Sequence, residues 1–160
     1  MHQTHNTLDL LIREQSINVL NHHLAAAIDL QGQVKQAHWN VRGSGFIAIH
    51  GLFDKIAELV ADDADQLAER CAALGGTAEG TIQVAVQNSF LVPYPLKVAD
   101  TSKHIFAVSA ALAAFGQSAR DASVQAATNG DADTADLFTE ISREIDRQLW
   151  FVESHATPKG

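Results

Sequence analysis

The chain has 160 residues, of which 46% are apolar, and carries a formal net charge of −8 from 11 basic and 19 acidic residues. These values suit one globular domain with a buried core, and the acidic surface repels the phosphate backbone of nucleic acids while it attracts cations. The single cysteine excludes an intrachain disulfide and a cysteine-based zinc site, so we expect a reducing, cytoplasmic setting. No apolar run reaches the roughly 18 residues that a membrane span needs, and the first residues lack the features of a secretory signal.

Two long helices are predicted in the first half of the chain, at residues 7–38 and 46–74. Apolar residues recur at steps of three and four along the first helix, as they do on the buried face of an amphipathic helix. Glycines mark the turn between the two helices and end the second one, at Gly75 and Gly76. Residues 1–7 are expected to form a short mobile tail.

A long connection, residues 77–100, follows the second helix. It contains Pro93 and Pro95 and is too long for a tight turn, so we predict a crossover that carries a short helix near residues 82–88. Asp100 caps a third long helix at residues 102–128, and a fourth covers residues 132–154. The sequence therefore predicts an all-α four-helix bundle with a long crossover, folded as one domain over residues 1–160.

Side chains that commonly bind metals recur on the second predicted helix and just before it. They are His38, His50, Asp54, Asp65 and Glu69. The last four fall within an arc of roughly 100° on a helix, so they share one face. Asp54 and Asp65 nevertheless lie about 16 Å apart along the helix axis, whereas metal–ligand bonds measure about 2 Å. One copy of this helix therefore cannot gather all of them around one ion.

The spacing of the four helical ligands is symmetric about the midpoint between residues 59 and 60. Two antiparallel copies of the helix, related by a two-fold axis there, would place His50 opposite the partner's Glu69 and Asp54 opposite the partner's Asp65. We therefore predict two equivalent metal sites per dimer, each shared between two chains.

Ligand type narrows the metal that such a site would take. Imidazole with carboxylates suits iron, manganese or zinc, and carboxylates with open positions suit an oxidisable Fe(II) better than a closed structural zinc. His38, at the end of the first helix, can turn in as a further nitrogen ligand. The alternative interpretation is a solvated polar face, because Glu58 and Asp62 lie near the same arc.

Residues 35–76 contain the pattern His-x11-His-x3-Asp-x10-Asp-x3-Glu, which resembles the ferroxidase ligands of the Dps family, the mini-ferritins, in type and spacing. The stretches YPL at 94–96, DTADLF at 133–138 and REIDRQLWFVES at 143–154 are similar to the same family, so the resemblance covers about residues 8–154. It implies a ferritin-like bundle assembled into a hollow twelve-subunit shell. It also implies that His38, His50 and Asp54 come from one subunit, with Asp65 and Glu69 from its partner.

The resemblance further implies a function in iron storage. Members of the family oxidise Fe(II), typically with hydrogen peroxide, and keep the ferric mineral inside the shell, which protects against oxidative damage. Zinc is a possible competitor at the same ligands, and the sequence leaves open whether peroxide or oxygen is preferred. Haem is not expected, because a haem-bearing bacterioferritin uses a methionine as axial ligand and the only one here is Met1.

Non-specific binding and compaction of DNA is the alternative function, since many family members also do this. They often use a lysine-rich terminal arm, which this chain lacks. Twelve copies would carry a formal charge of about −96 (12 × −8), which repels DNA. We therefore expect no binding of DNA at neutral pH.

Three acids open the fourth predicted helix, Asp131, Asp133 and Asp136. One interpretation is simple pairing with the helix dipole, which favours negative charge at a helix N-terminus. The other is an acidic pore, in which three-fold repetition in the shell draws Fe(II) inward. The resemblance places this segment near the family's three-fold channel, with Asp136 as the best candidate.

Five further residues are of types that can bind metals or take part in redox chemistry. Trp39 follows a proposed ligand, so it is either a core residue or an electron donor to stray oxidants at the site. His22, His23 and His104 are expected to be solvated or packed on helices rather than to bind metal. Cys71 is expected to be a small buried residue.

Overall fold

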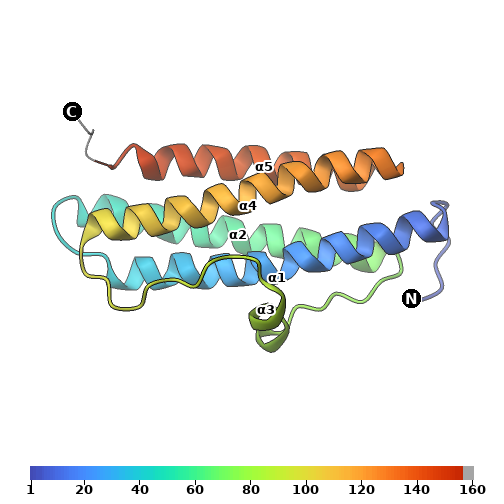
Figure 1. Ribbon diagram of the computed structural model, residues 1–160, viewed down its shortest axis with the longest axis horizontal. Coiled ribbons are helices and arrows are strands. Elements are labelled where there is room, and N and C mark those ends of the chain that lie inside the picture. The colour runs from blue at the N-terminus through green and yellow to red at the C-terminus, as the bar shows by residue number, and fades with distance from the viewer. Residues whose placement is uncertain (157–160) are drawn as a thin grey trace.

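The computed structural model describes residues 1–156, and every regular element in this range is a helix. The helices are α1 (Leu10–Asn40), α2 (Phe46–Ala73), α3 (Ile82–Asn88), α4 (Thr101–Asn129) and α5 (Ala132–Glu153). Four of them run lengthwise as a bundle, and the short α3 sits on the crossover (Figure 1). The predicted all-α bundle with a helix-bearing crossover is confirmed. No helix within residues 1–156 combines the length and the apolar character that a membrane span requires.

The crossover is long because it joins opposite ends of the bundle. α1 packs mainly on α2, and α4 packs mainly on α5. α2 ends near the N-terminus of the chain, whereas α4 begins at the far end, so residues 74–100 travel the length of the molecule (Figure 1). α3 lies against α1 on the way, which places this connection beside the end of α1 that carries His38.

The helix ends follow the caps that the sequence offers. α1 begins at Leu10 rather than at residue 7, because the Asp9 carboxylate accepts the N–H of Leu11 and stops the helix from extending backwards. It also continues two residues beyond the predicted end at residue 38. α4 ends at Gly130, whose φ of +92° is costly for any residue with a side chain. The predicted bounds of the other helices agree within one residue.

The core lies between the two helix pairs and is almost wholly apolar. Its largest fully buried side chains include Phe53 of α2, Phe115 of α4 and Phe138 of α5, together with Leu20 and Leu30 of α1. All four long helices thus contribute to one continuous core, which fixes the position of α2 and the ligands that it carries.

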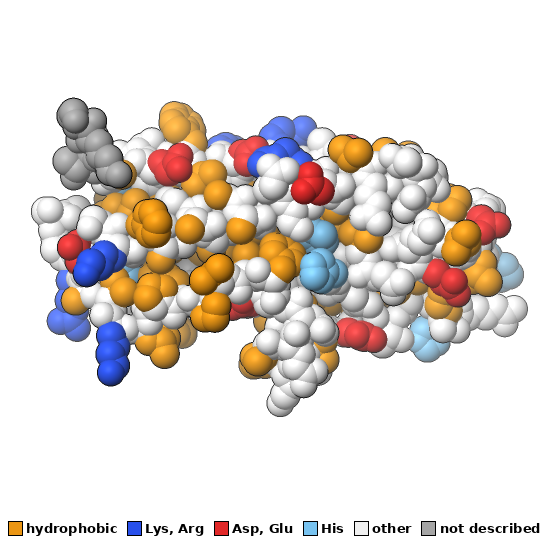
Figure 2. Space-filling view, viewed as in Figure 1, with side chains coloured by type: hydrophobic (Ala, Val, Ile, Leu, Met, Phe, Trp, Pro, Cys, Tyr) orange, Lys and Arg blue, Asp and Glu red, His pale blue; other side chains and the backbone are white. Residues whose placement is uncertain are grey.

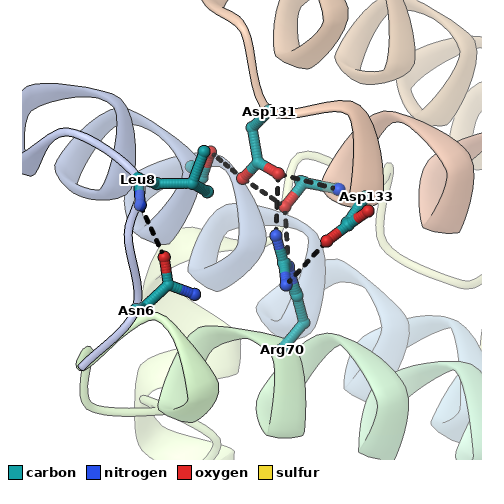
Figure 3. Close-up of polar contacts among 7 residues, drawn as sticks. Asn6, Leu8, Arg70, Asp131 and Asp133 are labelled. Carbon is teal, nitrogen blue, oxygen red and sulfur yellow. Dashed lines mark hydrogen bonds and ion pairs between the residues drawn. The ribbon is translucent and has the colours of Figure 1, made fainter. Parts of the chain in front are cut away.

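Residues 1–9 precede α1 and lie across the end of α2. The backbone N–H of His2 donates to the carbonyl of Gly75 at 2.7 Å, and the side chain of Arg13 donates to the carbonyls of Leu8 and Leu74. The Asn6 side chain accepts the N–H of Leu8 (Figure 3). The segment therefore has defined contacts in this structure, and the mobility predicted for residues 1–7 stays a prediction.

Asp63 of α2 is a buried acid without a cation beside it. The residue is 5% exposed, and among residues 1–156 its Oδ2 atom finds no hydrogen-bond partner. Burial raises the pKa of Asp63 to about 7, and the charges of Glu144, Asp62 and Glu140 act in the same direction. The carboxyl is therefore neutral in mildly acidic solution and becomes a buried, unpaired charge in alkaline solution.

Replacing this acid should change how stability depends on pH. In the unfolded chain an aspartate titrates near pH 3.9, so between about pH 4 and pH 7 the native state binds more protons and its stability falls as the pH rises. Asp63→Asn stays neutral and should raise the free energy of unfolding by up to roughly 4 kcal/mol above pH 7, with little effect below pH 4. Urea unfolding at equal protein concentrations measures this difference. The exposed neighbour Asp62→Asn is the control, and equal stabilisation by both variants would rule out burial as the cause.

Candidate metal centre

His38, His50 and Asp54 meet where the end of α1 lies beside the first turns of α2. The two imidazole rings stack with their centroids 3.7 Å apart and an interplanar angle of 22°. Nδ1 of His38 lies 2.8 Å from the backbone oxygen of His50, and Nδ1 of His50 lies 2.9 Å from the backbone oxygen of His38. A reciprocal pair of hydrogen bonds from side chain to backbone therefore holds both rings.

These hydrogen bonds determine which ring nitrogen can bind a metal. A carbonyl oxygen only accepts, so each Nδ1 carries the hydrogen and donates it, and Nε2 is the ring atom left for a metal, with a free lone pair in the neutral imidazole. Nε2 of His38 lies 3.8 Å from Oδ1 of Asp54. An ion bonded at about 2 Å to each atom would bridge this gap. Backbone carbonyls in these positions are the kind of outer partner that orients histidines in known metal sites.

The carboxylate of Asp54 also forms an ion pair with Lys35, which lies one turn before His38 on α1. Its Nζ lies 2.7 Å from Oδ1 of Asp54. This hydrogen bond from Lys35, helped by the nearby charges of His38 and Lys35, lowers the pKa of Asp54. Asp54 is therefore ionised near neutral pH, and an incoming metal ion must displace the ammonium group. Our sequence interpretation missed Lys35, although its three-residue spacing from His38 placed both on one helix face.

Asp65 and Glu69 do not join the other three ligands within one chain. Both are exposed on α2, beyond its midpoint. In the part of the chain that the structure describes, no group of three or more His, Cys, Asp or Glu side chains lies close enough to hold a metal ion. One chain thus presents two separate and incomplete half-sites. His38, His50 and Asp54 lie near one another without forming such a group, and Asp65 and Glu69 lie apart from them. The union of the two half-sites across a two-fold axis stays a prediction.

Trp39 lies beside the first half-site but outside the core of this chain. The residue is 66% exposed, and Nζ of Lys35 lies 5.9 Å from the centre of its indole ring. Both side chains line a hollow of about 670 Å³ between α1 and α3, which Pro93 of the crossover also borders. The interpretation of Trp39 as a core residue of the single chain is therefore wrong, and its role as an electron donor stays a prediction.

The three acids at the start of α5 have different surroundings, and Figure 3 labels two of them, Asp131 and Asp133. Asp131 is 1% exposed and accepts hydrogen bonds from Arg70 of α2, Ser16 of α1 and Thr134. Burial opposes its charge, but hydrogen bonds from Thr134 and Ser16, with the charge of Arg70, hold the pKa of Asp131 below its ordinary value. The carboxylate of Asp131 is the N-cap of α5 and faces the interior, so it is not available to line a pore.

The other two acids remain accessible at the surface. The side chain of Asp133 is 84% exposed, and its carboxylate lies 3.8 Å from the Arg70 guanidinium. Asp136 is exposed one helical turn further on. The pore role therefore stays a prediction for Asp133 and Asp136. Asp131 instead matches the other interpretation, in which an acid stabilises the N-terminus of a helix.

His23, His104 and Cys71 are buried, whereas His22 is exposed. His23 is buried among phenylalanine rings, and its ring nitrogens lie 2.8 Å from the carbonyl of Val19 and 2.9 Å from the Ser118 hydroxyl. Burial lowers the pKa of His23, which keeps the ring neutral. His104 is buried as well, and His22 packs on Phe90. The prediction of a packed role is confirmed for His23 and His104, and Cys71 is buried as expected.

Comparison with known proteins places this geometry in context. The sequence profile described as a ferritin-like domain matches residues 17–158. A curated protein from Agrobacterium fabrum, named DNA protection during starvation protein, is 37% identical over 99% of this chain and 98% of its own length. The solved Mycobacterium smegmatis Dps in its tetragonal form superposes with a TM-score of 0.93 at 26% identity, covering 100% of this chain and 96% of the other. Dps from Microbacterium arborescens in the high iron form gives a TM-score of 0.85 at 30% identity, covering 93% and 97%.

Removing the competing ammonium group should strengthen metal binding. Lys35→Met keeps much of the side chain's length and leaves the Asp54 carboxylate free, so the dissociation constant for Co(II), a redox-stable probe, should fall by up to about fivefold. Absorption titration of the metal-free protein measures this constant. Lys55→Met, at an exposed position next to Asp54 in the sequence, is the control for general charge effects. An equal fall in the dissociation constant in both variants would show that Lys35 does not compete specifically with the metal for Asp54.

Proposed function

Because this chain belongs to the Dps family of ferritin-like proteins, we propose that it is a ferroxidase that oxidises Fe(II) and stores the ferric product in a hollow shell of twelve subunits. Hydrogen peroxide is the proposed oxidant, and protection against oxidative damage is the result. The observation that carries this proposal is the half-site of His38, His50 and Asp54. It combines two imidazoles whose Nε2 atoms are free with an ionised carboxylate.

The donor set suits iron as the substrate. Imidazole and carboxylate both bind iron, and carboxylate oxygens stabilise Fe(III) more than Fe(II) because hard anions favour the higher charge. Asp54 with the partner's Asp65 and the partner's Glu69 would supply this preference. The high iron form of the similar M. arborescens Dps supports iron as the metal. Zinc uses the same ligand types, so we expect it to compete.

The proposed chemistry consumes both reagents that together form hydroxyl radicals. Two Fe(II) ions held close together can deliver two electrons to one peroxide molecule, so that no one-electron product has to leave the site. The paired half-sites of a dimer would hold the ions, and the carboxylates would stabilise the higher charge of Fe(III). Peroxide and Fe(II) are then removed in the same step, which accounts for protection.

Exposed apolar side chains support assembly into a shell. On the face that carries α3 and α4, orange side chains gather along the crossover and its neighbouring helices (Figure 2). Within the crossover, α3 and α4, the apolar residues that are more than 70% exposed are Ile82, Val86, Val92, Leu96 and Phe106. Monomeric proteins rarely leave extended apolar patches in water, so contact with other subunits would bury this surface.

DNA binding is the second candidate, since the similar A. fabrum protein is named for DNA protection. The net charge of −8 opposes it. Several of the basic residues are also engaged within the chain, since Lys35, Arg70 and Arg120 pair with aspartates. We therefore propose that protection comes from iron oxidation, and a gel-shift at low salt and neutral pH should show no complex.

Complementation between two defective variants tests whether the site is shared. His50→Ala/Asp54→Ala and Asp65→Ala/Glu69→Ala should each oxidise Fe(II) with peroxide at least roughly 10–100-fold more slowly than the wild type, since even outer partners of a metal are worth that much. When the two chains are produced together, half of randomly formed dimers are mixed, and each mixed dimer has one intact site. About one quarter of the sites, and of the activity, should return.

The outcomes of this experiment separate three possibilities. Recovery shows that the two half-sites function across subunits. Activity that stays lost in the mixture would place all the ligands of a site in one chain. Full activity in either variant alone would show that these residues are not the ferroxidase ligands, and it would overturn the proposed function.

The predicted pore at the start of α5 is tested separately. Acidic linings raise the arrival rate of cations by about tenfold or more at low ionic strength, so Asp136→Asn should slow iron uptake by about that factor, and high salt should remove the difference. Stopped-flow oxidation of added Fe(II) measures the rate. Asp121→Asn, an exposed acid on α4, is the charge-matched control, and unchanged uptake in Asp136→Asn would remove the pore role.

A further inference from the structure

Tyr94 is the only tyrosine in the chain, and it is paired with a buried histidine. Its hydroxyl lies 2.6 Å from Nδ1 of His104, which joins the crossover to the first turn of α4. His104 is 1% exposed. A buried tyrosine hydroxyl needs a hydrogen-bond partner, but many acceptors would serve for packing alone. An imidazole differs from a carbonyl because it can also take up the proton.

The surroundings of His104 suit a group that accepts a proton. Burial lowers the pKa of His104, so the ring is neutral, and Nδ1 can accept the tyrosine hydrogen. The backbone carbonyls of Val98 and Asn40 and the charge of Asp100 act in the opposite direction and favour the protonated ring. Nε2 has no hydrogen-bond partner within residues 1–156. The environment thus holds the ring neutral at rest and offers oxygen atoms near an imidazolium once it forms.

Simple acid–base chemistry does not explain the pair. Burial raises the pKa of Tyr94 to about 12, so a neutral imidazole does not remove its proton at neutral pH. Oxidation changes this balance, because a phenol that has lost one electron is a strong acid. A base at 2.6 Å can then take the proton as the electron leaves. This geometry lowers the energy needed to oxidise the phenol.

His104 lies near the backbone at the end of α1, two residues after the proposed ligand His38. Trp39 follows His38 in the chain, and the carbonyl of the next residue, Asn40, is one of those near His104. Pro93 borders the hollow that contains Trp39, and it also borders a cavity of about 590 Å³ that is lined by Tyr94. Tyr94 and Trp39 therefore lie on two sides of the same segment of the crossover.

We propose that Tyr94 and His104 form an electron-donor site that reduces one-electron oxidants which escape from the metal centre. The phenol gives one electron to the oxidant and its proton to Nδ1 of His104, leaving a neutral tyrosyl radical and an imidazolium. A hydroxyl radical that takes the electron becomes a hydroxide ion. A further Fe(II) ion then returns an electron to the tyrosyl radical and becomes Fe(III), while His104 returns the proton. The cycle rests on the proposed function for its oxidant and its final electron, whereas the donor chemistry of the pair does not.

The donor chemistry can be tested without iron. Azide radicals generated by pulse radiolysis in the assembled, metal-free protein should oxidise indole first, and the tryptophanyl absorption should then decay as the tyrosyl absorption grows. Because Tyr94 is the only tyrosine, the tyrosyl signal has one source, and Tyr94→Phe should abolish it. His104→Gln can still accept the hydrogen bond but cannot take the proton, so tyrosyl formation should slow on the order of 100-fold. Native mass and thermal unfolding verify that both variants assemble.

The same experiment can overturn the proposal. Tyrosyl formation at the wild-type rate in His104→Gln would show that the histidine only anchors the crossover. Absence of a tyrosyl signal in the wild type would show that the phenol is not an electron donor. Neither result would affect the proposed ferroxidase activity, because no iron is present.

A second measurement tests whether Tyr94 donates an electron during iron oxidation. In freeze-quenched samples of the wild type with Fe(II) and excess peroxide, electron paramagnetic resonance should detect a tyrosyl radical, which Tyr94→Phe lacks while it still oxidises Fe(II). Normal Fe(II) oxidation without any tyrosyl signal in the wild type would refute the protective role and leave the ferroxidase proposal intact. Absence of Fe(II) oxidation in the wild type would refute the ferroxidase proposal and, with it, this source of the oxidant.

Discussion

The short reach of a metal–ligand bond governs how this protein must be organised. Ligand atoms lie about 2 Å from an ion, whereas a straight helix holds Asp54 and Asp65 about 16 Å apart along its axis. α2 is packed into the core along its length, so it does not bend to close the gap. In the proposed site a second chain closes this gap, and the single chain presents half-sites and exposed apolar surface.

The first half-site is organised before any metal arrives. The reciprocal hydrogen bonds of His38 and His50 settle both ring orientation and tautomer, so binding does not have to order them. Lys35 meanwhile neutralises Asp54 in the metal-free chain. The proposed metal binding at this position would therefore exchange one cation for another, and the Lys35 pair avoids an unpaired carboxylate in the metal-free chain.

The second half-site is tied to the start of α5. Arg70 follows Glu69 on α2, but its side chain turns inward to the buried carboxylate of Asp131. Ser16 of α1 binds the same carboxylate, so α1, α2 and the N-terminus of α5 meet in one network (Figure 3). The surface that carries Asp133 and Asp136 is thereby held in a defined position relative to Glu69, which suits an entry route that delivers ions toward the site.

Local and helical patterns in the sequence determined the five helices, most of their ends and the positions of the five candidate ligands on them. They also determined that one chain cannot complete a site, since helix rise and angle follow from residue number alone. The tertiary structure decided the contacts between distant segments. These include the bonds between His38 and His50, the pairing of Lys35 with Asp54, the burial of Asp63 and the hydrogen bond between Tyr94 and His104. Asp131 shows the reason, because its partner Ser16 lies 115 residues away. Periodicity tells which face a side chain occupies, but only the packing of helices tells which other side chain faces it.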